Sequence, residues 1–150
     1  MVKEEDLIEM SYLRAVIKET LRLHSAAPLS VPRESVEDCQ IERYLIPKGT
    51  RVIINAWAIN RDPKFWEAVE EFHPERFIGN SVDYKGNNFQ FITFGAGRRI
   101  CPVLGFAIST VELMLANLVY HFDWELPRGV MQEMNMAKNF GLIWAMFNGI

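Results

Sequence analysis

The sequence predicts a mixed α and β fold, α+β in class, in which helices dominate and the sheets are small. Apolar residues recur at helical spacing between Ser11 and His24, and again between Leu104 and Phe122. The β-prone run Arg51–Asn55 follows a Pro-Lys-Gly turn, which indicates a short strand. A length of 150 residues is the usual size of one domain, so we expect a single core.

The first helix is expected to start with Ser11 as its N-cap and to end before Pro28 and Pro32, which force an extended path. Its apolar face carries Leu13, Val16, Ile17 and Leu21. The second helix starts after Pro102 and is apolar on nearly every side, which predicts a helix buried almost all round. Glu112 in its middle argues against a membrane span.

The remaining segments are predicted to form short elements. Cys39–Trp57 is typical of a hairpin that turns at Pro47–Gly49. Asp62-Pro63 is a cap followed by a proline, so a short helix is expected through Trp66. Phe72–Phe94 is expected to be irregular, and Phe140–Trp144 to form a short strand or a hairpin.

Composition excludes several classes of protein. The 16 basic and 19 acidic residues give a net charge of −3, which disfavours binding to nucleic acid or to an anionic membrane through bulk charge. Two cysteines are too few for a secreted disulfide scaffold. The acidic start of the chain does not resemble a signal peptide, and the chain as given is expected to be soluble or peripheral.

Two sets of residues could carry chemistry. Glu19 and Arg22 share a helix face, where an exposed ion pair is the commoner arrangement; Arg76 could complete a triad, but spacing alone does not show it. The run Phe94–Pro102 contains two glycines, two arginines and Cys101 at the mouth of a helix, which favours a thiolate. Such a sulfur could be a nucleophile, a soft metal ligand or a small buried side chain.

Other sites are excluded by residue type. A phosphate-binding loop would need a lysine that is absent here, and the three histidines are too scattered for a zinc site.

The cysteine run, the Glu19–Arg22 pair and the Pro-Glu-Arg-Phe sequence between them occur in an order that resembles the cytochrome P-450 heme-thiolate monooxygenases. Lys18–His24, Asn55–Pro63 and Tyr120–Trp124 further resemble the plant microsomal branch. The resemblance covers nearly the whole chain and maps onto the family's C-terminal part. It implies that residues 1–150 are a single partial domain with two long helices, small β-sheets and a cysteine loop.

The resemblance also implies roles for individual residues. Cys101 would be the axial thiolate ligand of heme iron, and Arg33 and Arg99 would pair with the heme propionates. The implied heme-binding set is Arg33, Phe94, Gly95, Gly97, Arg99 and Cys101. Glu19, Arg22 and Arg76 would form a buried structural triad. The implied substrate contacts are Ala27, Leu29, Ser30, Val31, Leu142 and Ile143.

The implied activity is hydroxylation of a hydrophobic small molecule with O2, using electrons from an NADPH-dependent flavoprotein reductase. Arg98 either helps to dock that reductase or is simply solvated. The implied location is the cytosolic face of the endoplasmic reticulum membrane, through an N-terminal anchor outside this sequence; no nucleic-acid partner is expected. The alternatives are a truncated non-catalytic fragment that binds no heme, and a thiol enzyme with Cys101 as nucleophile.

Three places in the sequence depart from the family pattern. Val103 stands where the family usually has glycine, and a β-branched residue there is costly if the backbone needs a positive φ. Ser25-Ala26 and Ala68-Val69 stand where relatives more often have prolines, which is expected to loosen two turns.

Overall fold

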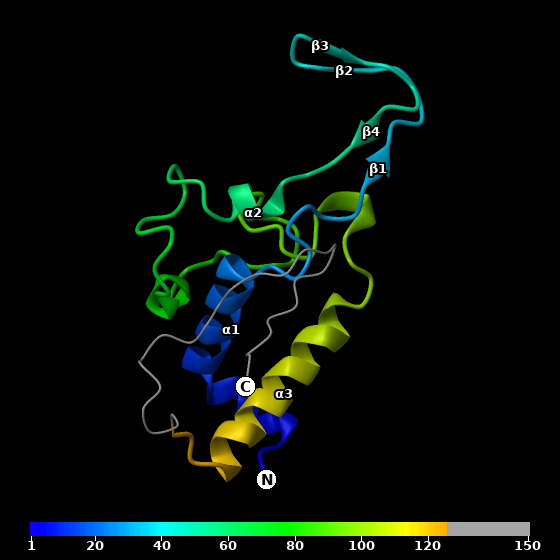
Figure 1. Ribbon diagram of the computed structural model, residues 1–150. Helices are drawn as coiled ribbons and strands as arrows, with labels where there is room; N and C mark the ends of the chain where they lie inside the picture. Colours follow the sequence, from blue (N-terminus) through cyan, green and yellow to red (C-terminus); the bar gives the residue numbers. More distant parts are fainter. Residues whose placement is uncertain (126–150) are drawn as a thin grey trace.

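The structure is a computed structural model that describes residues 1–125. Figure 1 shows its two long helices, α1 (Ser11–Leu23) and α3 (Leu104–His121), packed against each other below an extended β arm. The arm contains β1 (Arg33–Glu34), β2 (Cys39–Ile41), β3 (Tyr44–Ile46) and β4 (Arg51–Val52). The short helical elements are η1 (Glu4–Glu9), α2 (Ala56–Ile59), η2 (Pro74–Phe77) and η3 (Gly97–Arg99), where η denotes a 3-10 helix. A mixed, mainly helical fold with small sheets was expected and is confirmed.

Helix α1 has nearly the predicted bounds. Its N-cap is Met10, which makes no side-chain cap, so Ser11 is the first helical residue and not the cap. The buried face carries two charged residues, Glu19 and Arg22, among apolar neighbours. The apolar periodicity therefore predicted where the helix lies, but it did not predict that the buried face carries charged residues.

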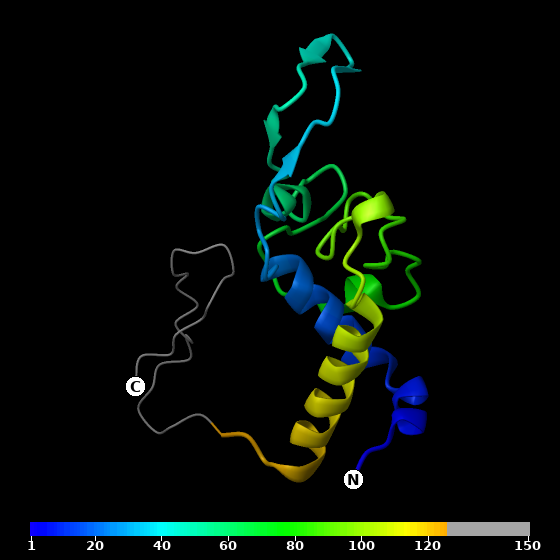
Figure 2. The same ribbon diagram turned by 90° about the vertical axis from the view of Figure 1, so that its right-hand side faces the viewer.

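The β arm is built differently from the predicted hairpin. Two antiparallel ladders form, with Arg33 opposite Val52 and Cys39 opposite Ile46. The hairpin turns at Glu42, whose φ of 53° lets two residues reverse the chain. The predicted turn at Pro47–Gly49 also forms, with a 3.2 Å hydrogen bond from the Thr50 amide to the Pro47 carbonyl, but it connects β3 to β4 and does not close the hairpin. Figure 2 shows the arm extending away from the helices, so few long-range contacts fix the position of its turn.

The short helix lies earlier in the chain than the sequence predicted. Asn55 caps α2 by accepting a hydrogen bond from the Ala58 amide at 3.0 Å. Asp62–Trp66 forms only one turn, closed by a 3.1 Å hydrogen bond from the Trp66 amide to the Asp62 carbonyl. Both segments have a good capping residue, and the chain forms a helix at the earlier cap.

An aromatic core joins α1 to the segments around it. Trp66, Phe77 and Phe91 are buried with Ala15 of α1, and the ring centroids of Phe77 and Phe91 lie 5.4 Å apart. Trp66 contacts both of the other rings, at 5.6 and 6.1 Å. Such pairs add about 0.5–1.5 kcal/mol each beyond their burial. This core supports the chain directly before the run Phe94–Pro102, which contains Cys101 and is called the cysteine loop.

Helix α3 is exposed over most of its length, so the prediction of an all-round buried helix is wrong. Ile108 and Ala116 are buried, whereas Phe106 is 78% exposed and Met114 61% exposed. The apolar residues encircle the helix, but within the described residues only one side meets α1 and η1. By length and composition alone this helix could cross a membrane, with a mean hydropathy of 1.3.

The first prediction concerns Asn117, which holds the start of the chain against α3. Its side-chain oxygen accepts from the Val2 amide at 3.0 Å, and its side-chain nitrogen donates to the Val2 carbonyl at 3.1 Å. Asn117→Ala leaves both backbone groups without these partners and should cost about 1–3 kcal/mol in the free energy of unfolding. Urea denaturation checks this, with the exposed Gln40→Ala as control. Equal urea midpoints for the two variants would contradict it.

Candidate functional site

The cysteine loop is a tight backbone structure between the aromatic core and α3. Gly95 and Gly97 adopt positive φ values of 78° and 68°, which other residues rarely adopt. The Cys101 amide donates to the Phe94 carbonyl at 3.0 Å and so closes the loop on itself. Cys101 is partly buried and lies three residues before the first residue of α3. The sulfur is therefore accessible but held on a defined backbone.

Cys101 opens onto a cavity of about 680 Å³ whose lining is mostly apolar. The second wall of this cavity comes from the segment after α1, which the sequence had assigned to substrate contacts. The predicted site residues that line it are Ala27, Ser30, Val31, Arg33, Phe94, Gly95, Arg99 and Cys101. The fold thus brings together residues that are 61 to 74 positions apart in the sequence.

Four predicted site residues do not line this cavity. Gly97 lines an adjoining hollow of about 570 Å³ together with Gly95, Arg33 and Arg99. Leu29 is 47% exposed and lines none of the cavities described here. Leu142 and Ile143 lie outside the described residues, as does the strand expected at Phe140–Trp144.

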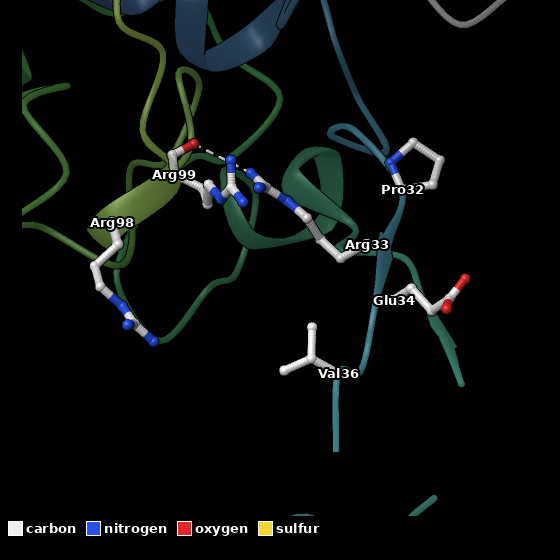
Figure 3. A pocket seen from close by; sticks show the side chains of 6 residues that line it. All are labelled: Pro32, Arg33, Glu34, Val36, Arg98 and Arg99. Atoms are coloured by element: carbon white, nitrogen blue, oxygen red, sulfur yellow. Dashed lines mark hydrogen bonds between the residues drawn. The ribbon is translucent and has the colours of Figure 1, made fainter. Parts of the chain in front are cut away.

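Three arginines gather at one edge of the site. Figure 3 shows Arg33 pointing toward Arg99, whose carbonyl accepts from Arg33 Nη2 at 3.1 Å, whereas Arg98 points away from both. All three line a hollow of about 570 Å³, and within residues 1–125 none of them forms an ion pair with a carboxylate. Guanidinium groups bind carboxylates in bidentate fashion, so this edge suits a ligand that carries carboxylates.

The donor set fits a heme better than a bare metal ion. No group of three or more His, Cys, Asp or Glu side chains that could hold a metal occurs in the described part of the chain. A single sulfur facing an apolar cavity suits a metal that arrives with its other ligands in a planar group. Arg33 and Arg99 at the edge of the same cavity suit acidic substituents on that group.

Every N–H group of the Arg22 side chain donates a hydrogen bond. Its Nε and Nη2 donate to the two carboxylate oxygens of Glu19, each at 2.8 Å. Its remaining N–H groups donate to the carbonyls of Asn60, Val69 and Glu71 at 3.0, 2.8 and 3.2 Å. These five hydrogen bonds match the five N–H groups of a guanidinium, so Arg22 fastens two distant segments to α1.

Glu19 is held by two arginines and one amide. Arg76 Nε donates to its Oε1 at 3.2 Å, and the His73 amide donates to the same oxygen at 2.9 Å. Burial by itself would raise the pKa of Glu19, but the hydrogen bonds from Arg22 and His73 and the charges of Arg22 and Arg76 hold the pKa below its ordinary value. Glu19 and Arg22 are fully buried, so the solvated pair that is commoner for this spacing is not what forms.

Three residues near the site were missed by the sequence analysis. A Cβ at Gly86, where φ is 80°, would lie 2.7 Å from Cδ1 of Ile100, so this turn packs closely on the cysteine loop. Thr93 and Asn60 form hydrogen bonds that join the loop to α1. The sequence shows that Gly86 lies in a turn and that Thr93 lies beside the loop, but no local pattern indicates which residues they contact.

The second prediction concerns the donors of Arg22. Arg22→Lys keeps the charge but supplies three donors in place of five, which leaves buried carbonyls unpaired. The free energy of unfolding should fall by at least about 2 kcal/mol, measured by urea denaturation. Arg43→Lys, in the exposed hairpin, is the matched control and should change it by less than about 0.5 kcal/mol. Similar losses in both variants would contradict the assigned role.

The third prediction concerns pH. Because the pKa of Glu19 is lowered in the folded chain, its contribution to stability is present above its ordinary value of 4.5 and is lost as the pH falls through the folded value. Glu19→Gln should lower stability at pH 7 and flatten its decline in acid. Urea midpoints between pH 7 and pH 3 check this. Glu5→Gln, which removes an exposed carboxylate, should leave the pH profile unchanged.

Comparison with known proteins places the chain in one family. The family model for Cytochrome P450 matches residues 1–146. The chain is 57% identical over 141 residues to desmethyl-deoxy-podophyllotoxin synthase of Sinopodophyllum hexandrum, covering 93% of this chain and 28% of that protein. It is 60% identical over 142 residues to cytochrome P450 71A1 of Persea americana, covering 94% and 28%. The chain thus spans about 28% of the length of these relatives.

Solved structures agree with the sequence relatives. A zebra fish cytochrome P450 solved with abiraterone superposes with a TM-score of 0.81 at 30% identity, covering 93% of this chain and 31% of that one. A cyanobacterial CYP120A1 with bound retinoic acid gives 0.74 at 32% identity, covering 89% and 30%. The fold class and the family resemblance predicted from sequence are both confirmed. With a family model matched over nearly its whole length, this chain belongs to the cytochrome P450 family.

Proposed function

We propose that Cys101 is the axial thiolate ligand of a heme and that the chain carries the ligand loop of a monooxygenase. One observation carries this proposal: Cys101, several apolar residues, Arg33 and Arg99 line the same cavity. A heme needs a metal ligand, apolar surface for its ring and cations for its propionates. When bound, heme supplies the activation of O2 and the insertion of one oxygen atom into a substrate.

The chain's own residues have separate tasks in this proposal. The positive φ of Gly95 lets the loop turn beside the ring, since its missing side chain leaves the backbone free to approach. Phe94 lines the cavity next to the sulfur and limits the access of water to it. Arg33 and Arg99 orient the ring by its carboxylates, and Arg33 is steadied by its hydrogen bond to the Arg99 carbonyl.

The substrate class and the partners follow from the apolar lining and from the family. Ala27 and Val31 give the cavity an apolar second wall, which suits a hydrophobic small molecule. Electrons would come from an NADPH-dependent flavoprotein reductase, for which Arg98 offers an exposed cation. The relatives include desmethyl-deoxy-podophyllotoxin synthase and salviol synthase, whose names support a role in plant secondary metabolism. A location at the endoplasmic reticulum membrane is proposed from the family resemblance alone. We further propose that residues 1–150 form one partial domain.

A second candidate function is a polypeptide of the same family that binds no heme. The observation that favours it is the exposed apolar surface of α3, together with a cavity that, within residues 1–125, is lined only by Thr93, the loop and the segment after α1. Such a chain would keep the cysteine loop without retaining a cofactor. The test below separates the two functions.

The fourth prediction tests heme ligation. The 150-residue chain is mixed with heme, reduced and exposed to carbon monoxide, and the difference spectrum is recorded. The chain should give a Soret band shifted to the red, as expected for thiolate ligation, and Cys101→Ser should abolish that shift. Cys39→Ser, which changes the exposed cysteine of β2, is the matched control and should keep it. A spectrum without the shift in the unaltered chain would support the non-catalytic polypeptide.

The fifth prediction concerns Val103, which caps α3 with a φ of −100° and a ψ of 13°. This backbone is open to a β-branched residue, so the cost expected for a positive φ does not arise. Val103 is 57% exposed and does not line the cavity that contains Cys101. Val103→Gly should therefore change heme affinity by less than about twofold in a spectroscopic titration. A clear gain in affinity would show that Val103 obstructs the ring.

A further inference from the structure

Thr93 lies two residues before Gly95, where the chain enters the cysteine loop. Its hydroxyl donates a 2.7 Å hydrogen bond to the Leu21 carbonyl. Leu21 is in the last turn of α1, which ends at Leu23, so its carbonyl is among the four at a helix end that lack an intrahelical partner. Thr93 therefore gives one of the free carbonyls at the end of α1 a hydrogen-bond partner, and the same bond attaches the loop to the helix.

Two buried polar side chains surround the same hydroxyl. Asn60 Nδ2 donates to Thr93 Oγ1 at 3.4 Å, and the Ser25 hydroxyl oxygen lies 3.4 Å from it. Ser25 and Asn60 are both completely buried. Ser25 was expected to loosen its turn by replacing a proline, but in the structure its hydroxyl lies within this polar cluster. Ser25 and Asn60 need these partners because water does not reach them, whereas Thr93 is partly exposed and also lines the cavity.

Asn60 connects this cluster to the buried triad. Its carbonyl accepts from Arg22 Nη1 at 3.0 Å, while its side chain donates to Thr93. Beyond Thr93, the next residue along the chain is Phe94, whose carbonyl holds the Cys101 amide at 3.0 Å. A continuous set of hydrogen bonds and one peptide unit thus runs from Arg22 to the closing bond of the cysteine loop.

We propose that Thr93 is a positioning residue for Cys101. Its hydroxyl fixes the entry of the loop on α1, and this keeps the Phe94–Cys101 bond closed and the sulfur facing the cavity. The inference rests on the proposed function only in taking Cys101 as the working residue. An apolar side chain of the same shape would leave the Leu21 carbonyl and the Asn60 amide without this partner.

The test measures hydrogen exchange of backbone amides in the heme-free 150-residue chain. Thr93→Val should lower the protection of the Cys101 and Gly95 amides roughly tenfold, because one partly buried hydrogen bond is lost at the loop entry. Amides within α3 should keep their protection. Thr93→Ser retains the hydroxyl and should restore the protection of the loop. Thr20→Val removes a hydroxyl bonded within α1, to the Val16 carbonyl, and should leave the loop unchanged.

Alkylation by iodoacetamide gives a second readout of the same loop. Cys39 is exposed in the arm and serves as the internal standard within each sample. The ratio of Cys101 to Cys39 modification, measured by mass spectrometry, should rise several-fold in Thr93→Val and return in Thr93→Ser. A general loss of stability would instead lower the protection of α3 and of the loop equally.

Three results would overturn the inference: an unprotected Cys101 amide in the unaltered chain, equal loss of protection in the loop and in α3, or no effect of Thr93→Val. Heme titration of the same variants is read separately. Loop protection that depends on Thr93 in a chain that takes up no heme would contradict the proposed function and leave the positioning role in place.

Discussion

The buried carboxylate of Glu19 is the constraint on which the rest of this structure depends. It lies fully out of water, so it is stable only while Arg22, Arg76 and the His73 amide all reach it. These groups come from α1, from η2 and from the residue that precedes η2. Each of these segments is therefore needed before the charge is satisfied, and the three form as one unit. Such an arrangement contributes little net stability compared with apolar packing, but it allows only one relative placement of the segments.

This placement gives the cysteine loop a rigid base. The Arg22 guanidinium lies 5.4 Å from the ring centre of Trp66, so the triad and the aromatic core are in contact. Phe91, which is completely buried in that core, lies only three residues before Phe94. Within the loop, the positive φ values occur at Gly95 and Gly97, where the backbone turns sharply. A loop with a fixed entry and a glycine-rich interior can approach a flat ligand closely without losing the direction of its sulfur.

The sequence predicted what depends on neighbours in the chain and failed where partners are distant. Apolar spacing located both long helices, and the glycines and Cys101 marked the loop, because these features are local. The burial of Glu19 did not follow from its spacing to Arg22, since the residues opposite come from later segments, and it was implied only by the family resemblance. The exposure of Phe106 was missed for a related reason: an apolar surface shows that a helix can be buried, but not what covers it. The hairpin turn at Glu42 depends on a register that no neighbour specifies.

The cysteine loop and the cavity beside it have different structural requirements in this chain. The loop is organised by contacts within the described residues, from the triad through Asn60 and Thr93 to the closing bond at Cys101. The pocket needs walls, and the cavity of about 680 Å³ receives them from the loop and from the segment after α1. Positioning a sulfur is thus separable from retaining a large planar group, which gains most of its affinity from buried apolar area. A preorganised Cys101 loop is consistent with both a heme-binding chain and a heme-free one, so the decisive property is the extent of apolar surface that meets the ring.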